Sequence, residues 1–255
     1  MTPRGAAVPQ QAFVLHRYDW SESSLIVDLF TREAGRVVVA AKGAKRPTSG
    51  LRAVLLPFQR IAVSFGRGRA ETPAEVHNLR GAEWAGGAPI VGAGALLAGF
   101  YLNELLMKLV ARDDPHPVLW DRYAQALPWL GGSNEAAALR AFELALLREL
   151  GLLPDLARVT ALQAAVEPAR PYALAAEAGV IAAAADARGT LTGVQLVALQ
   201  AALDGGDFEA LRAACAGCEP PLRWQLRHLL AYHLGHAPLR TREVVRQLHS
   251  VLDTQ

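Results

Sequence analysis

The chain of 255 residues contains only two cysteines, Cys215 and Cys218, and they stand three positions apart. Two thiols so close in sequence are too few for a disulfide framework, which agrees with a reducing compartment. The first eleven residues carry one arginine and no apolar run after it, which is not the pattern of a secretory signal. We therefore expect a cytoplasmic protein.

A long apolar segment of the membrane-spanning kind is also missing. Residues 84–103 carry no charge over 20 positions, about the length that a bilayer requires. That stretch contains five glycines and Pro89, however, and its most frequent apolar residue is alanine, so its insertion into lipid would be unfavourable. The segment predicts a small-residue helix buried in a bundle.

The motifs of common catalytic sites are absent as well. The sequence lacks a G-x-S-x-G elbow, a phosphate-binding P-loop, an H-E-x-x-H zinc helix and a G-x-G-x-x-G turn. Asp28 is the one carboxylate expected to be buried in the N-terminal strands, and one carboxylate does not make an acid/base pair. We expect no catalytic site and no cofactor.

The charge that is present is distributed unevenly. A chain of this length with 52% hydrophobic residues can bury a core of one or two domains, and its net charge is only +2. Residues 1–80 nevertheless hold 12 Lys and Arg against 6 Asp and Glu, whereas the counts are 7 against 10 in residues 81–170 and 7 against 8 in residues 171–255. The N-terminal third is therefore the basic part of the chain.

The first 80 residues alternate apolar and polar positions in short runs that turn residues separate. This pattern is typical of a small β-barrel, and five strands fit an OB-fold. The expected strands cover residues 12–18, 24–31, 36–42, 59–65 and 72–79.

From about residue 90 the spacing becomes helical, so we predict an α+β protein with an OB-fold domain over residues 1–80 and a mainly helical domain over residues 81–255. One helix is expected over residues 93–110, a second begins in the run Asp114-Pro115-His116-Pro117, and a third runs from Ser133 or Asn134 to Leu150. Three more helices are expected to begin at Thr192, Pro220 and Thr241. Thr192 and Gln195 have the spacing of a capping box. Residues 155–189 are weakly patterned, with turns at Arg170-Pro171 and Gly179 around a short hairpin.

A basic, glycine-containing loop follows the third expected strand. Lys42, Lys45 and Arg46 lie in it, and Arg52 comes shortly after. Arg67 and Arg69 form a second basic loop after the fourth strand. Cationic side chains on such loops suit backbone phosphates, and the aromatic residues nearby would stack on bases. These aromatic residues are Phe13, Tyr18, Trp20 and Phe58. The alternative is a solvated basic surface above a core that contains the aromatic residues.

Cys215 and Cys218 precede three histidines, His228, His233 and His236, and this group superficially resembles a zinc site. Nine residues separate Cys218 from His228, and the histidines lie among apolar residues of a helix. The spacing favours packing cysteines and ordinary histidines over a metal site. A thiol or zinc enzyme centred on Cys215 stays as an alternative of another class.

Several blocks of the sequence, taken together, resemble the bacterial RecO family of DNA repair mediators. The run FVLHRYDWSESSLIVDLFTREAGRVVVAAKGAKR is similar to the family's N-terminal signature. The resemblance continues through GRGR, NELLMKLV, DPHPVLWDRY, ALRAFELALLRELG and LGHAPLRTREVVRQL, from about Ala12 to Leu248. The combination of blocks is specific, although each block alone is weak.

The resemblance implies an OB-fold followed by a helical domain, binding of single- and double-stranded DNA, strand annealing, and work in the RecF pathway near the nucleoid. It also implies two partners, RecR and the acidic C-terminal tail of single-stranded DNA-binding protein, with which RecA is loaded on coated strands. Carried over by motif, Lys42, Lys45 and Arg46 fall in the DNA-binding loop, and Arg140 and Leu144 fall in the helix that docks the tail. An arginine beside apolar side chains suits a tail that ends in a carboxylate.

Two points qualify the resemblance. Zinc-bearing members of the family place two cysteine pairs in the segment after the helix that ends near Gly151, and residues 155–189 of this chain contain no cysteine. We therefore expect no metal there. The other reading of Arg140 is a surface arginine that pairs with Glu143 or Glu135. An RNA-binding OB-fold protein of translation or RNA processing remains the alternative function.

Overall fold

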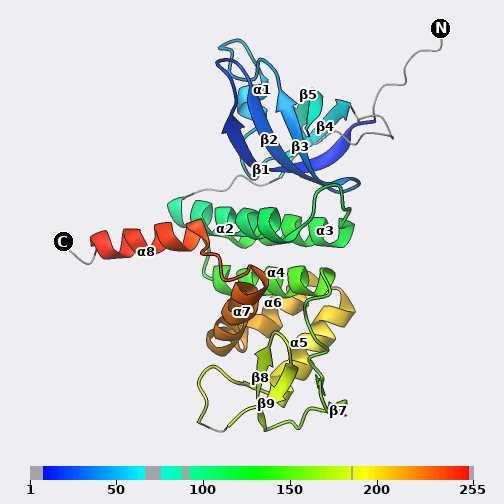
Figure 1. The fold of residues 1–255 in the computed structure, drawn as a ribbon, viewed down its shortest axis with the longest axis vertical. Coiled ribbons are helices and arrows are strands. Elements are labelled where there is room, and N and C mark those ends of the chain that lie inside the picture. Colours follow the sequence, from blue (N-terminus) through cyan, green and yellow to red (C-terminus); the bar gives the residue numbers. More distant parts are fainter. Residues whose placement is uncertain (1–7, 67–75, 88–91, 185, 253–255) are drawn as a thin grey trace. The chain divides into compact units, whose positions relative to one another are not determined.

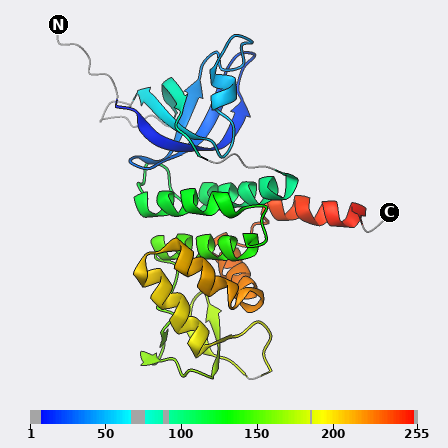
Figure 2. The same ribbon diagram turned by 180° about the vertical axis from the view of Figure 1, so that it is seen from behind.

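The computed structural model describes residues 8–66, 76–87, 92–184 and 186–252. The chain divides into two compact units, one of residues 1–90 and 103–121, the other of residues 91–102 and 122–255. Figures 1 and 2 show their elements from two sides. The strands are β1 (Gln10–Asp19), β2 (Leu25–Thr31), β3 (Gly35–Ala41), β4 (Arg60–Gly66), β5 (His77–Trp84), β6 (Arg158–Val159), β7 (Ala164–Ala165), β8 (Pro171–Ala175), β9 (Gly179–Ala182) and β10 (Leu191–Thr192). The helices are α1 (Leu51–Val54), α2 (Ala93–Leu109), α3 (Pro117–Ala126), η1 (Leu127–Trp129), α4 (Glu135–Glu149), α5 (Gly193–Gly205), α6 (Phe208–Ala216), α7 (Glu219–His233) and α8 (Arg240–Leu252).

The first unit is built on a closed barrel with the strand order β1-β2-β3-β5-β4. β4 pairs back to β1, and every neighbouring pair is antiparallel except β3 and β5, which are parallel. This closed five-stranded arrangement is that of an OB-fold and confirms the predicted fold class. Closure leaves no free sheet edge in the barrel.

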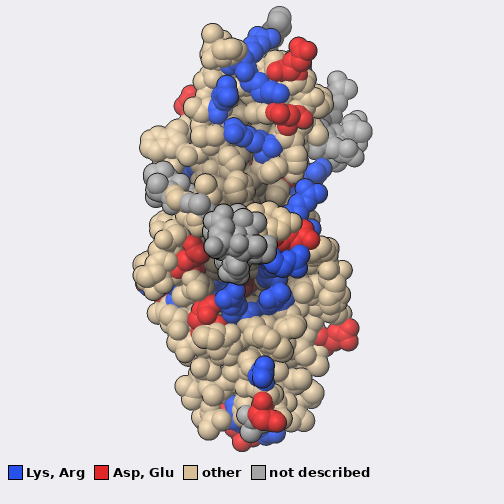
Figure 3. All heavy atoms as spheres, turned by 90° about the vertical axis from the view of Figure 1, so that its left-hand side faces the viewer, with Lys and Arg blue, Asp and Glu red and all other residues tan. Residues whose placement is uncertain are grey.

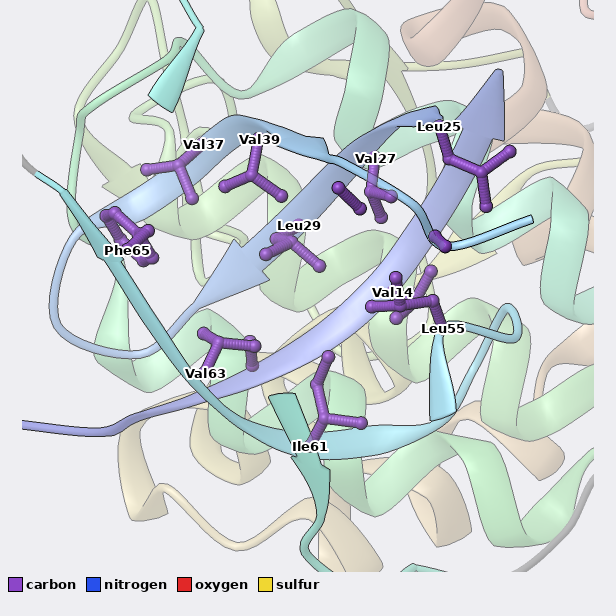
Figure 4. Packing of buried hydrophobic residues seen from close by; sticks show 13 residues of the cluster. Val14, Leu25, Val27, Leu29, Val37, Val39, Leu55, Ile61, Val63 and Phe65 are labelled. Carbon is purple, nitrogen blue, oxygen red and sulfur yellow. The ribbon is translucent and has the colours of Figure 1, made fainter. Parts of the chain in front are cut away.

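The interior of the barrel is filled by β-branched and aliphatic side chains from alternate strand positions. Figure 4 shows Leu55, which follows α1, beside Val14 near one end of this cluster, and Phe65 beside Val37 near the other. Ala44 in the loop after β3 belongs to the same cluster and is completely buried. The loop that carries the predicted phosphate ligands is therefore anchored by its own alanine in the barrel core.

The outer face of β1 and β2 is also buried, because residues 103–121 pack against it. The amide of Asn103 donates to the carbonyl of Leu15 at 2.7 Å, and the indole of Trp120 donates to the carbonyl of Phe30 at 3.0 Å. The ring of Phe13 lies 4.9 Å from that of Trp120. Barrels of this type often bind oligonucleotides across the face of their second and third strands. In this chain helical residues occupy part of that face, so the loops at the barrel's end are the better candidates.

The first four predicted strands are confirmed within two residues at each end. The fifth was placed too early, at residues 72–79, whereas β5 runs over His77–Trp84, and residues 72–75 lie outside the described part. β5 is set by its pairing with β4, from Asn78 opposite Gly66 to Trp84 opposite Ile61. Its exposed side chains are mixed in polarity, so alternation alone was a weak guide.

In the second unit α6 packs against α4, α5 and α7, and these helices can be followed in both views (Figures 1 and 2). The predicted capping box is confirmed: Thr192 Oγ1 accepts from the amide of Gln195, whose side chain accepts from the amide of Thr192. Helix α6 was not among the helices predicted from the sequence. Gly206, with φ +69°, ends α5, and the side chain of Asp207 caps α6.

The predicted hairpin is confirmed as β8 and β9, which pair antiparallel and are joined at residues 176–178. β8 also contacts α7, so this small sheet packs on the helical unit. This weakly patterned segment is thus held by strand pairing and packing. Over the described ranges, none of the helices is both long and apolar enough to cross a membrane.

Candidate nucleic-acid interface

Two connections lie side by side at one end of the barrel. Asp19 pairs with Leu25, and Leu25 with Ala41, so the β1–β2 turn and the loop after β3 start side by side. β4 is antiparallel to β1, with Val63 opposite Gln10, so β4 ends beside the start of β1 and away from this turn. The strand register therefore places the predicted basic loop after β3 beside the β1–β2 turn. We call the group formed by residues 18–24 and 42–46 the loop cluster.

Lys45 joins the two parts of the loop cluster. Its backbone amide donates to the carbonyl of Ser23 at 3.0 Å, and its Nζ donates to the carbonyl of Ser21 at 3.1 Å. The same Nζ lies 3.2 Å from Oδ1 of Asp19. Lys45 is consequently a structural link as well as a cation, because its ammonium is already shared by two oxygens.

Lys42 and Arg46 are exposed on the same loop. The loop turns at Gly43, with φ +72°, and the side chain of Arg46 lies across that glycine. Their charged ends can reach phosphate oxygens without breaking an ion pair, since neither forms one with the described residues. These two side chains are the freest cations of the loop cluster.

The aromatic candidates divide into two kinds. Tyr18 and Trp20 are 47% and 59% exposed and lie at the β1–β2 turn, where a base could stack. Phe13 and Phe58 are 3% and 6% exposed and belong to the core, so their prediction as stacking surfaces was wrong. Phe13 faces Trp120, a contact between residues far apart in sequence that alternation could not indicate.

The remaining predicted cations are not among the residues that define the loop cluster, or they fall outside the described residues. Arg52 is exposed on α1, six positions after Arg46. Arg67 and Arg69 fall in residues 67–75, which the structure does not describe. The sequence reading missed Arg80, which is exposed on β5 and lies against Gly66. Figure 3 shows Lys and Arg side chains gathered on the part of the surface that belongs to the barrel, with acidic side chains at the margin.

Arg36 and Asp28 form a buried ion pair in the barrel wall. Nε of Arg36 lies 3.3 Å from Oδ1 of Asp28, and Nη1 of Arg36 donates to the carbonyls of Met107 and Val110. Burial raises the pKa of Asp28, and the positive charges of Arg36 and Arg112 oppose that rise. The arginine also satisfies carbonyls at the end of α2, so this pair is explained by structure and requires no ligand.

Arg140 and Leu144, the predicted tail-binding residues, are buried in α4, as is every residue from Arg140 to Leu147. Arg140 is 7% exposed, and its Nη2 donates to Oε1 of Glu143 at 2.7 Å. Oε1 also accepts from the hydroxyl of Tyr101 at 2.5 Å, and Arg242 donates to that hydroxyl at 3.1 Å. The pairing with Glu143 was one of the two readings of Arg140, but the pair is buried and not on the surface. An incoming carboxylate would have to compete with Glu143.

The two cysteines are free and buried. Burial raises the pKa of the Cys218 thiol to about 11 and raises that of Cys215 as well. Both thiols are therefore neutral near pH 7 and are poor nucleophiles. Across the described part of the chain, no group of three or more His, Cys, Asp or Glu side chains is arranged to hold a metal ion.

The closed barrel and the helical unit after it define an OB-fold protein with a helical extension. Two family models match it: Recombination protein O N terminal over residues 6–84 and Recombination protein O C terminal over residues 93–243. The chain belongs to the RecO family.

Named relatives agree with these matches. The DNA repair protein RecO of Polaromonas naphthalenivorans (strain CJ2) is 49% identical over 246 residues, which covers 95% of this chain and 97% of that protein. The proteins of the same name from Delftia acidovorans and Variovorax paradoxus are 48% and 46% identical, and each alignment covers 95% of this chain and 96% of the relative. The family resemblance seen in the sequence blocks is therefore confirmed.

Proposed function

We propose that this chain is a non-enzymatic mediator of DNA repair and recombination that binds single- and double-stranded DNA through the barrel. In this proposal it anneals complementary strands and, with RecR, helps to load RecA on coated strands in the bacterial cytoplasm. The observation that carries the DNA-binding part is the loop cluster, where exposed Lys42 and Arg46 lie on the same barrel end as exposed Trp20. Cations for phosphates and an aromatic ring for a base are the two elements of single-strand binding.

The two predicted domains are assigned different binding roles. We assign DNA contact to residues 1–80, with Lys42, Lys45, Arg46, Arg52, Arg67 and Arg69 as the phosphate ligands. Residues 81–255 then carry the partner surfaces. Arg140 and Leu144 remain the predicted contacts for the acidic tail of single-stranded DNA-binding protein. Because Arg140 already pairs with Glu143, tail binding there requires the tail carboxylate to take the place of Glu143.

The test of DNA binding is a titration of a fluorescein-labelled thymidine strand, followed by anisotropy at several salt concentrations. If about six phosphates are contacted, log K falls with log salt at a slope of about −4. Replacing Lys42, Lys45 and Arg46 by Ala should weaken binding to all sequences alike and reduce the slope by about 2. The charge-matched control replaces Arg148, Arg158 and Arg170, three exposed arginines of the second unit.

Three results would refute the proposal. A flat salt response of the wild-type protein would show that phosphates are not the ligands. Equal losses in the loop-cluster and control variants would show a non-specific effect of net charge. Preferential displacement of the DNA strand by an RNA strand of the same sequence would favour the RNA-binding alternative.

A further inference from the structure

The exposed face of α7 combines an indole ring with basic side chains and is separate from the loop cluster. Arg223, Trp224, Arg227 and His228 stand at positions i, i+1, i+4 and i+5 of the helix and are all exposed. The opposite face is buried through Leu222, Gln225, Leu226, Leu229 and Leu230. Because α-helical residues repeat every 3.6 positions, the four exposed side chains form one continuous patch. We call it the α7 patch.

Trp224 is held in place although it is 47% exposed. Its indole lies on the backbone of Gly189, where an added Cβ would come within 2.9 Å of Cδ2 of the ring. Gly189 has φ +68°, and Gln225, the next residue of α7, donates to its carbonyl. The ring of His228 lies 4.1 Å from the indole. A large apolar ring fixed at the surface in this way loses little entropy when it binds a ligand.

The charges around the ring favour an anionic ligand. Arg223 and Arg227 form no salt bridge within the described residues, although the charge of Arg223 acts on the buried carboxylate of Glu143, and Arg188, next to Gly189, is also exposed. The nearest acids in sequence are Asp186 and Glu219. Glu177 is engaged further along the helix, where it accepts from the hydroxyl of Tyr232 at 2.8 Å. The patch around Trp224 therefore carries more positive than negative charge.

We propose that the α7 patch is a second binding surface for single-stranded DNA. Trp224 would stack on an unpaired base, and Arg223 and Arg227 would bind the phosphates on either side. The two arginines are separated by about 6 Å along the helix axis, which is comparable with the distance between neighbouring phosphates of an extended strand. A duplex has no free base face for the indole, so the single strand is the better ligand. The choice of DNA rests on the proposed function.

A second surface would allow one molecule to hold two strands. The loop cluster lies in the first unit and the α7 patch in the second. Neither surface shares a residue with the other, so each can be removed without altering the other. This separation makes the inference testable independently of the barrel.

The experiment measures binding of a fluorescein-labelled thymidine strand to the full-length chain in which Lys42, Lys45 and Arg46 are already Ala. In that background Trp224→Ala should weaken the remaining binding about tenfold, within the range of one lost base stack. Arg223→Ala with Arg227→Ala should weaken it as well and reduce the salt slope by about 1.4. Arg158→Ala with Arg170→Ala is the control for the lost charge and should change affinity less than twofold. Trp224→Phe should retain most of the binding.

A second readout does not depend on variants. A strand that contains 5-bromodeoxyuridine, irradiated on the wild-type protein, should cross-link to Trp224, and mass spectrometry would identify the peptide. The inference is overturned if the background variant has no residual binding, if Trp224→Ala binds like its parent, or if no α7 peptide is cross-linked. It is also overturned if an acidic peptide binds in a Trp224-dependent way and the DNA strand does not compete.

The same binding measurements distinguish failure of the proposed DNA binding by the barrel from failure of the α7 patch. If the loop-cluster variant binds as tightly as the wild type and Trp224→Ala in that background abolishes binding, the barrel assignment fails and the α7 patch is supported. If the loop-cluster variant loses all binding, the barrel assignment is supported and the α7 patch fails.

Discussion

Arg140 and Glu143 form an ion pair within one turn of α4, with Nη2 of the arginine 2.7 Å from Oε1 of the carboxylate, and both side chains are buried. Nε of Arg140 and Oε2 of Glu143 have no hydrogen-bond partner among the described residues. Desolvation of the two charges is therefore only partly compensated. Each charge mainly offsets the cost of burying the other, and the pair adds little net stability.

Removing one member of this pair should be costly. Arg140→Ala leaves Glu143 buried without its arginine, and we expect a loss of about 3 kcal/mol or more in the free energy of unfolding. Arg140→Met combined with Glu143→Gln removes both charges and keeps an acceptor for the Tyr101 hydroxyl, so it should cost clearly less than Arg140→Ala alone. Urea unfolding followed by circular dichroism measures both. A double variant as unstable as the single one would mean that the pair contributes net stability.

This prediction affects how tail binding is tested. A loss of tail affinity in Arg140→Ala can come from unfolding, so the binding assay needs the stability measurement beside it. The double variant, if stable, is the better reagent, because it lacks the guanidinium without an unpaired carboxylate. Retained affinity for the acidic tail in the stable double variant would remove Arg140 from the tail site.

Because burial raises the pKa of Asp28, the free energy of unfolding should depend on pH. Burial raises this pKa above its ordinary value of 3.8, so the folded state holds the proton over a range in which the unfolded state has lost it. The contribution of Asp28 is complete below the unfolded pKa and is lost as pH rises through the folded pKa. The free energy of unfolding of the wild type, relative to Asp28→Asn, should therefore fall as pH rises from about 4.

Asp204→Asn is the control with the opposite sign. The hydrogen bond from Arg148 lowers the pKa of Asp204, so its contribution is present above the unfolded pKa and is lost as pH falls through the folded pKa. Relative to Asp204→Asn, the wild type should gain stability as pH rises. Urea unfolding at several pH values would contradict both assignments if the two differences had the same sign.

Gly35 and Gly43 make a matched pair, because both have positive φ, +71° and +72°, but their surroundings differ. A Cβ on Gly35 would lie 2.0 Å from the carbonyl oxygen of Asp114, whereas on Gly43 its nearest neighbours would be side-chain atoms of Arg46, the first at 3.6 Å. Gly43→Ala should cost about 1 kcal/mol for the left-handed backbone alone. Gly35→Ala adds a clash with backbone and should cost about 3 kcal/mol or more. Equal thermal stabilities would refute this close approach.

The sequence predicted best those features that depend on neighbouring residues. The capping box at Thr192 and Gln195 and the first four strands are local patterns, and the structure contains them. The burial of Arg140 could not be predicted, because it depends on Tyr101, on another helix. The same holds for Phe13, whose partner Trp120 comes from α3. The basic loop of the candidate site could be predicted from consecutive residues, but the hydrogen bond from Lys45 to the β1–β2 turn could not.

Trp20 provides the sharpest test of the loop cluster, because the barrel carries a second exposed tryptophan beside the other end of β1. Trp20 follows β1 at the end where Lys42 and Arg46 lie, and it is 59% exposed. Trp84 is 64% exposed, and its partner Ile61 pairs with Ala12 near the start of β1, seven positions before Asp19. Both indoles are solvated, so replacing either with Ala should change stability little.

Their effects on DNA binding should differ. Trp20→Ala removes a stacking surface beside the phosphate ligands and should weaken binding of a thymidine strand by about 1–3 kcal/mol, with little change in the salt slope because no charge is lost. Trp84→Ala should bind the strand like the wild type. Anisotropy titrations at two salt concentrations separate these outcomes. If Trp84→Ala is impaired and Trp20→Ala is not, the strand lies beside the start of β1, because stacking acts only on bases in direct contact with the ring.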